Sequence, residues 1–276
     1  MAIATAQNNP CGLAVDAQNV YWTTAAGDVL AVPVGGGTPT TLASGQNNPC
    51  GLAVAGAQVY WLNASASGQL MTVPAAGGTA VTLADGLRRP WKLVVRAGEI
   101  HWTDQSDGTV MKMPSGGGPQ IVVAERQSAP VALDVDDRAV YWTSVGVSAI
   151  RFLTFDAGAT VQTLATDQDA AANIRVRDGV AYWTNDSTGE VRKAAVAGGP
   201  PVTLASGLGS YGLAVDAEYV YWTDDVAGTV MKVPLGGGTP TVIASGQQSP
   251  TEIAVDDHDV YWIDSVFDGA LLKAAK

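Results

Sequence analysis

The chain has 276 residues, of which 47% are hydrophobic and 15% are charged. This composition supplies enough apolar side chains for a large folded core and is not typical of a disordered protein. The formal net charge is −11, which disfavours nucleic-acid binding because phosphate contacts need clustered Lys and Arg. No run of about 20 apolar residues is present, so insertion into a membrane is not expected. We also expect no signal peptide, since the N-terminus lacks a basic region and an apolar segment.

A repeat of about 40 residues runs through the whole chain. An aromatic residue followed by Trp marks each copy, and successive Trp residues are 39, 41, 40, 41, 39 and 40 positions apart. Each copy contains four short runs rich in Val, Leu, Thr and aromatic residues, separated by Gly, Pro and Asp, which is typical of strands joined by turns. The seven pairs are Tyr21-Trp22, Tyr60-Trp61, His101-Trp102, Tyr141-Trp142, Tyr182-Trp183, Tyr221-Trp222 and Tyr261-Trp262.

Four strands in about 40 residues predict one blade of a β-propeller. The predicted blades cover about residues 10–45, 49–85, 90–125, 130–166, 172–206, 211–246 and 250–276. The last copy ends after its third strand, and segment 3–10 matches segment 41–49 after a one-residue gap. We therefore expect residues 2–6 to complete the last blade, which removes two open sheet edges. The sequence predicts one all-β domain, residues 1–276, forming a monomeric seven-bladed β-propeller with four antiparallel strands per blade.

Several motifs resemble known propeller repeats. Residues 220–224 read V-Y-W-T-D, residues 102–104 read W-T-D, and G-L-A-V-D precedes several copies. They resemble the YWTD repeats of low-density-lipoprotein-receptor class B propellers, and the lead-in segments also resemble NHL-type repeats, as in bacterial secreted or surface repeat proteins. The resemblance implies a blade type rather than an activity. YWTD propellers generally have six blades, and several copies here lack the Asp, so the family's ligand preferences are not carried over. The residues in place of that Asp are Thr24, Asn63, Ser144 and Asn185.

One column of the repeat, the residue that opens the inner strand, is predicted to form a ring at the mouth of the central channel. We call the face that carries this mouth, together with the turns between second and third strands, the top face. Two aromatic residues in the column can stack on sugar rings or apolar side chains, and packing that plugs the channel is the alternative. The candidate ligand-binding residues are Trp91, Tyr211, Thr251, Cys11 and Cys50 from this column and Lys92 and Glu252 from the next.

The only two cysteines, Cys11 and Cys50, lie on adjacent predicted blades within this ring. A disulfide needs Cα atoms about 5.5–6 Å apart, which neighbouring positions near a narrow channel can approach. We predict two partly buried free thiols, with a disulfide as the alternative. Asp134 and Arg175 share another column on adjacent blades and predict an ion pair between those blades, with a polar feature of the channel wall as the alternative.

Three turns of the predicted top face are rich in Asp. None has the 12-residue EF-hand pattern, and Asp and Gly ordinarily shape turns, which is the interpretation favoured here. Calcium coordination by carboxylate oxygens is the alternative, and no other cofactor is expected. The residues concerned are Asp104, Asp107, Asp224, Asp225, Asp264 and Asp268.

Neither histidine is placed for catalysis. His101 replaces the Tyr of the third copy and is predicted to fill a core position, whereas His258 lies in the first hairpin turn of the last copy, on the opposite face. General acid–base catalysis needs groups that converge on one pocket. Some bacterial seven-bladed propellers of related repeat type resemble this chain and are lyases that inactivate virginiamycin, an activity that would need a histidine on the top face.

The sequence therefore favours a non-enzymatic binding propeller that recognises a protein, peptide or glycan at the channel mouth. One alternative is a lyase- or hydrolase-like, metal-assisted enzyme that uses top-face carboxylates such as Glu252, Asp224 and Asp264. The other is a natural or engineered repeat scaffold without a small ligand. We expect an exported or cell-surface domain that lacks its leader, or a cytoplasmic protein if the chain is engineered.

Overall fold

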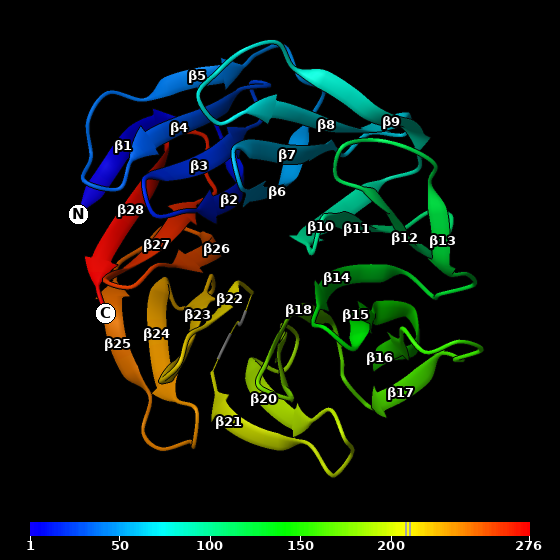
Figure 1. Ribbon diagram of the computed structural model, residues 1–276. Helices are drawn as coiled ribbons and strands as arrows, with labels where there is room; N and C mark the ends of the chain where they lie inside the picture. Colours follow the sequence, from blue (N-terminus) through cyan, green and yellow to red (C-terminus); the bar gives the residue numbers. More distant parts are fainter. Residues whose placement is uncertain (208, 210) are drawn as a thin grey trace.

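The computed structural model describes residues 1–207, 209 and 211–276, which form seven four-stranded antiparallel sheets arranged in a ring (Figure 1). Each sheet is one blade, and we number the blades 1 to 7 in chain order. Successive strands of a blade are neighbours in the sheet, so each blade is built outward from the central axis. The predicted fold class, a seven-bladed all-β propeller, is confirmed.

The strands of the first four blades have the following bounds, from the inner to the outer strand. Blade 1 contains β2 (Pro10–Val15), β3 (Asn19–Thr24), β4 (Val29–Pro33) and β5 (Thr40–Ala43). Blade 2 contains β6 (Pro49–Ala55), β7 (Gln58–Asn63), β8 (Gly68–Pro74) and β9 (Val81–Leu87). Blade 3 contains β10 (Pro90–Arg96), β11 (Glu99–Asp104), β12 (Thr109–Pro114) and β13 (Ile121–Ala124). Blade 4 contains β14 (Pro130–Val135), β15 (Ala139–Ser144), β16 (Ala149–Thr154) and β17 (Gln162–Ala165).

The other three blades follow the same plan. Blade 5 contains β18 (Ala171–Arg177), β19 (Val180–Asn185), β20 (Glu190–Ala195) and β21 (Val202–Ser206). Blade 6 contains β22 (Leu213–Val215), β23 (Tyr219–Asp224), β24 (Thr229–Pro234) and β25 (Thr241–Ser245). Blade 7 contains β26 (Pro250–Val255), β27 (Asp259–Asp264), β28 (Gly269–Ala275) and β1 (Ala2–Gln7). A short 3₁₀ helix, η1 (Val145–Val147), lies in one turn of blade 4, and no helix in the described part of the chain has the length and hydropathy to cross a bilayer.

The two ends of the chain close the ring. Strand β1 pairs with β28 in antiparallel register, with Ala2 opposite Leu272 and Gln7 opposite Gly269. The two strands lie side by side in Figure 1, where the N-terminal strand is blue and the C-terminal strand is red. The prediction that the N-terminal strand completes the last blade is therefore confirmed.

The aromatic–Trp pairs form the core between blades. The Tyr of one blade packs in the same hydrophobic cluster as the Trp of the next, as Tyr21 does with Trp61 and Tyr221 with Trp262. All seven Trp residues of the pairs are at most 4% exposed. Large buried aromatic side chains contribute strongly to a core, so each pair stabilises the contact of its blade with both neighbours. The predicted use of the pairs as interblade core is confirmed.

The Thr that follows an aromatic–Trp pair links the inner strands of adjacent blades. Thr223 Oγ1 accepts a hydrogen bond from Gly212 N at 2.8 Å and donates one to Thr251 O of the next blade at 2.6 Å. Thr103 and Thr184 donate in the same way, to Val131 O and Tyr211 O. Because the acceptors are the residues that open the inner strands, these bonds fix the backbone of the channel mouth.

Replacing Thr223 with Val keeps the shape of the side chain but leaves the Gly212 N–H and the Thr251 carbonyl without this partner. Unsatisfied buried polar groups cost about 1–3 kcal/mol each. With two such groups, we expect the free energy of unfolding in urea to fall by about 2–6 kcal/mol for Thr223→Val. Thr241→Val, on the exposed outer strand β25, is the control and should change it by less than about 0.5 kcal/mol. Equal effects of the two substitutions would contradict the interblade role of Thr223.

Candidate functional site

The mouth of the channel contains a cavity of about 210 Å³. Its lining includes all of the ligand-binding residues that the sequence predicted, and they come from blades 1, 2, 3, 6 and 7. Their role in binding stays a prediction, but the structure brings them together in one site. These residues are Cys11, Cys50, Trp91, Lys92, Tyr211, Thr251 and Glu252.

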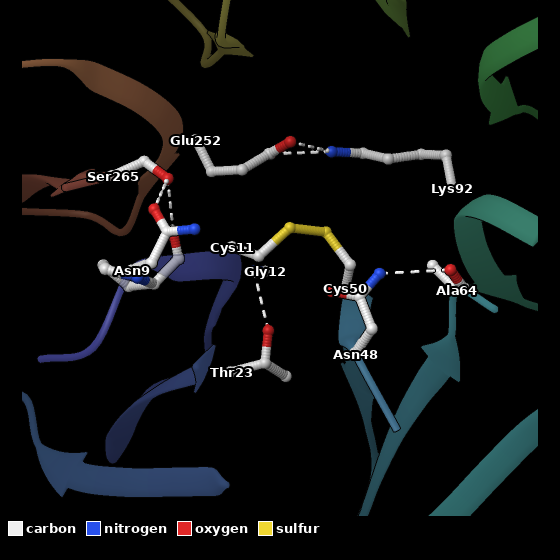
Figure 2. The surroundings of a disulfide bond; sticks show 11 residues. Asn9, Cys11, Gly12, Thr23, Asn48, Cys50, Ala64, Lys92, Glu252 and Ser265 are labelled. Atoms are coloured by element: carbon white, nitrogen blue, oxygen red, sulfur yellow. Dashed lines mark hydrogen bonds and ion pairs between the residues drawn. A yellow bond between two sulfur atoms is a disulfide. The ribbon is translucent and has the colours of Figure 1, made fainter. Parts of the chain in front are cut away.

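Cys11 and Cys50 form a disulfide that joins blades 1 and 2 at the mouth (Figure 2). Their Cα atoms are 5.2 Å apart, so the preferred prediction of two free thiols is wrong. The reason is the close approach of the inner strands at their top ends. At Gly51, which has a φ of +41°, an added Cβ would lie only 2.6 Å from Trp91 O of the next blade. Blades 1 and 2 approach as closely, since a Cβ added at Gly12 would lie 2.9 Å from the Cβ of Leu52.

Lys92 and Glu252 form an ion pair that crosses the channel from blade 3 to blade 7. Lys92 Nζ lies 2.7 and 2.6 Å from the two carboxylate oxygens of Glu252. The two side chains are 12% and 16% exposed, and burial lowers the pKa of Lys92 while the charge of Glu252 opposes that change. Figure 2 shows the two side chains meeting end to end beside the disulfide. The mouth therefore contains one largely buried charge of each sign.

A second cavity of about 310 Å³ lies in the channel, lined by Lys92, Asp134, Arg175 and apolar residues of the inner strands. The predicted ion pair between Asp134 and Arg175 is wrong. Asp134 Oδ2 instead accepts a hydrogen bond from Val176 N of blade 5 at 2.7 Å, and Arg175 Nη1 donates to Ile174 O at 2.8 Å. The carboxylate does link the two blades, but it does so through the backbone, which lies nearer than the guanidinium.

Tyr211 lies on an acidic side of the mouth. Burial raises the pKa of its hydroxyl, and the charges of Glu252, Asp186 and Asp225 raise it further. Two apolar side chains in turns of the same face are strongly exposed, Val226 at 66% and Phe267 at 77%. The top face of blades 5 to 7 thus offers aromatic, apolar and acidic contacts around the mouth.

The Asp-rich turns use their carboxylates to hold the backbone between blades. Asp104 accepts a hydrogen bond from Arg88 N at 2.7 Å, and Asp264 accepts one from Gln248 N at 3.2 Å. Asp224 Oδ1 accepts from Gly209 N, between blades 5 and 6, at 3.1 Å, and from Ala227 N of its own turn at 2.7 Å. Among the described residues, no group of three or more His, Cys, Asp or Glu side chains is arranged to hold a metal ion. Calcium binding by these turns, and by the remaining residues Asp107, Asp225 and Asp268, stays an untested prediction.

The two histidines lie outside the cavity at the mouth. His101 is 1% exposed, and neither ring nitrogen has a hydrogen-bond partner in the described part of the chain. Burial lowers its pKa to about 4, as the core position predicted for it implies. His258 is exposed in the turn between β26 and β27, where its backbone N–H donates to Asp256. Neither side chain lines the cavity at the mouth.

A scan against protein-family models finds no match, and a search of curated proteins finds none either. Among solved structures, this chain is similar to a catalytically inactive histidine-to-alanine variant of virginiamycin B lyase from Staphylococcus aureus with quinupristin. The two chains are 14% identical with a TM-score of 0.83, over 100% of this chain and 98% of that chain. A nidogen/laminin complex is 18% identical with a TM-score of 0.67, over 81% of this chain and 92% of that chain. The computationally designed protein Ika8 is 15% identical with a TM-score of 0.74, over 99% of this chain and 98% of that chain. Identities this low show the fold alone.

Reduction of the disulfide should destabilise the protein. The bond closes a loop with a sequence separation of 39, and disulfides typically contribute about 2–4 kcal/mol to the free energy of unfolding. We expect a loss of that size in urea denaturation with a thiol reductant. A Cys11→Ser/Cys50→Ser variant should have the same free energy of unfolding as the reduced protein, and the reductant should not change that value. Free thiols detected in the unreduced, unfolded wild type would contradict the bond.

His101 should make stability depend on pH. In the unfolded chain a His binds a proton near pH 6.5, whereas His101 in the folded protein binds one only near pH 4. Between these values the unfolded state binds more protons, so stability is present above pH 6.5 and falls as the pH decreases. We expect wild type to lose about 3 kcal/mol more than His101→Tyr across this window in urea titrations. Equal pH slopes for the two proteins would contradict the buried neutral state of His101.

Proposed function

We propose that the chain is a non-enzymatic binding propeller that recognises a protein, peptide or glycan at the channel mouth of its top face. The observation that carries this proposal is the convergence of the candidate side chains from five blades on one cavity of about 210 Å³. Pockets for drug-sized ligands measure about 300–1,000 Å³. The cavity therefore suits one ring or one side chain of a larger ligand, with the rest of that ligand lying across the top face.

The two aromatic residues of the mouth support this proposal over a plugged channel. Trp91 and Tyr211 both line the cavity and are only partly buried. Within the described part of the chain, the close ring contacts do not include a pair formed by these two side chains. Partly exposed aromatic rings on a concave surface can stack on sugars and on apolar side chains. Exposed Phe267 and Val226 extend the apolar surface beyond the mouth.

The chemistry of the top face favours binding over a lyase- or hydrolase-like activity. The inactive form of the similar lyase has a histidine replaced by alanine. In this chain one histidine is buried with a pKa near 4 and the other lies in a turn at the opposite end of the blades. Three of the top-face carboxylates are hydrogen-bonded to backbone N–H groups. Similarity to a nidogen/laminin complex is compatible with a protein as the ligand.

The proposal is tested by thermal shifts against a panel of glycans and peptides. A ligand at 100 times its dissociation constant stabilises the folded state by about 2.7 kcal/mol, which is an easily measured shift. We expect at least one member of the panel to stabilise wild type and to have no effect on Trp91→Ala/Tyr211→Ala. Tyr219→Ala, in β23 at the opposite face, is the matched control and should respond like wild type. Binding that survives in the double variant, or a panel without any ligand, would contradict the proposal.

A further inference from the structure

The buried ion pair in the mouth defines the charge of the ligand that fits there. We propose that the mouth binds a small zwitterion of the α-amino acid class, whose ammonium and carboxylate groups insert between Lys92 and Glu252. This inference rests on the part of the proposed function that makes the mouth a binding site, because it uses the same cavity, and it goes beyond that proposal since its ligand is a single free amino acid.

The fold does not require the Lys92–Glu252 pair. Residues at the same position of the repeat in the other five blades are uncharged, and those blades still close around the channel. Replacing a buried ion pair by uncharged residues of similar size is often neutral for stability, whereas removing one partner is strongly destabilising. The pair is therefore a departure from the repeat that blade formation does not call for. The five uncharged residues are Gly12, Gly51, Ala132, Asn173 and Gly212.

Charge balance selects the ligand. Glu252 and Lys92 neutralise each other while they are in contact. A cationic ligand that bound Glu252 would leave the buried Lys92 ammonium unpaired, and an anionic ligand that bound Lys92 would leave the Glu252 carboxylate unpaired. Each buried unpaired charge is costly. A zwitterion gives both residues a new partner, so only this class replaces the ion pair without leaving a buried charge uncompensated.

The channel has room for an amino acid to insert between Lys92 and Glu252. The pair borders the mouth cavity of about 210 Å³, and Lys92 also lines the lower cavity of about 310 Å³. The charged residues of the lower cavity, Asp134 and Arg175, are of opposite sign, and both act on the Lys92 ammonium. At about 30 Å³ per water molecule, the mouth cavity has the volume of roughly seven waters, which is the scale of one amino acid.

The surroundings of the pair define an orientation for the zwitterion. The ammonium group belongs on the side of Glu252, where the Tyr211 ring and the acidic residues Asp186 and Asp225 also lie. An ammonium group over an aromatic ring adds a favourable cation–π contact. The carboxylate belongs at Lys92 Nζ, on the opposite wall of the channel (Figure 2). The side chain of the amino acid then has Trp91 as its apolar contact.

Isothermal calorimetry with four matched probes tests the inference. L-Phenylalanine is a zwitterion, L-phenylalaninamide a cation, N-acetyl-L-phenylalanine an anion and N-acetyl-L-phenylalaninamide is neutral. We expect phenylalanine to bind wild type at least about tenfold more tightly than the other three. The cation and the anion each leave one charge of the pair without a partner, and the neutral probe offers a partner to neither charge. Affinities of the four probes that agree within about threefold would overturn the inference.

A variant that removes both charges together provides the control. Lys92→Met/Glu252→Gln keeps the size of both side chains, so we expect its urea midpoint to stay near that of wild type. In this variant phenylalanine should lose its advantage over the neutral probe. A preference for phenylalanine that persists in the variant would overturn the inference, even if the variant folds normally.

The outcomes separate this inference from the proposed function. Suppose that the neutral probe binds as tightly as phenylalanine and that neither binds Trp91→Ala/Tyr211→Ala. The zwitterion inference is then wrong, and the mouth stays a binding site. If none of the four probes binds but a glycan or peptide gives a shift that depends on Trp91, the inference again fails alone. If phenylalanine binds both Trp91→Ala/Tyr211→Ala and Lys92→Met/Glu252→Gln as it binds wild type, both fail.

Discussion

The hydrogen bonds and the disulfide that link the top ends of adjacent inner strands determine where the residues of the channel mouth lie. Three Thr hydroxyls donate to the carbonyl of the residue that opens the next inner strand. Where blade 7 has Ile263 in place of that Thr, Ser265 Oγ donates to Pro10 O of blade 1 at 2.8 Å, and the disulfide joins blades 1 and 2. The mouth is therefore held by several independent bonds between blades. A site fixed before the ligand arrives binds with a smaller loss of conformational entropy.

The repeat explains the frame, and the departures from the repeat explain the site. Residues that recur in every copy form the interblade core and the turns, whereas the residues that line the mouth differ from blade to blade. Trp91 and Tyr211 supply aromatic surface, and Lys92 and Glu252 supply the only charges at their position of the repeat. These side chains come from blades distant in the chain, with Lys92 and Glu252 separated by 160 residues. The ring closure by β1 and β28 brings them into one cavity.

Much of this could be predicted because strand patterns and repeat columns depend on local sequence. The blade count followed from the aromatic–Trp pairs, and closure followed from the missing fourth strand of the last copy. The disulfide was only the alternative to free thiols because it depends on a Cα separation of 5.2 Å, which column alignment does not provide. The partner of Asp134 was missed because it is the backbone N–H of Val176, a group that every strand residue carries. The contact of Lys92 with Glu252 depends on the width of the channel, and a repeat alignment does not contain that width.

The most direct test of the mouth as the binding site uses the indole resonances of the eight Trp residues in ¹⁵N-labelled protein. Trp91 is the only Trp outside the aromatic–Trp pairs, and its resonance is assigned with Trp91→Phe. During titration with a glycan or peptide that stabilises the protein, we expect a large shift of the Trp91 indole resonance, while the resonances of the seven buried Trp residues stay in place. A ligand that shifts buried indoles and leaves the Trp91 resonance unchanged would contradict it.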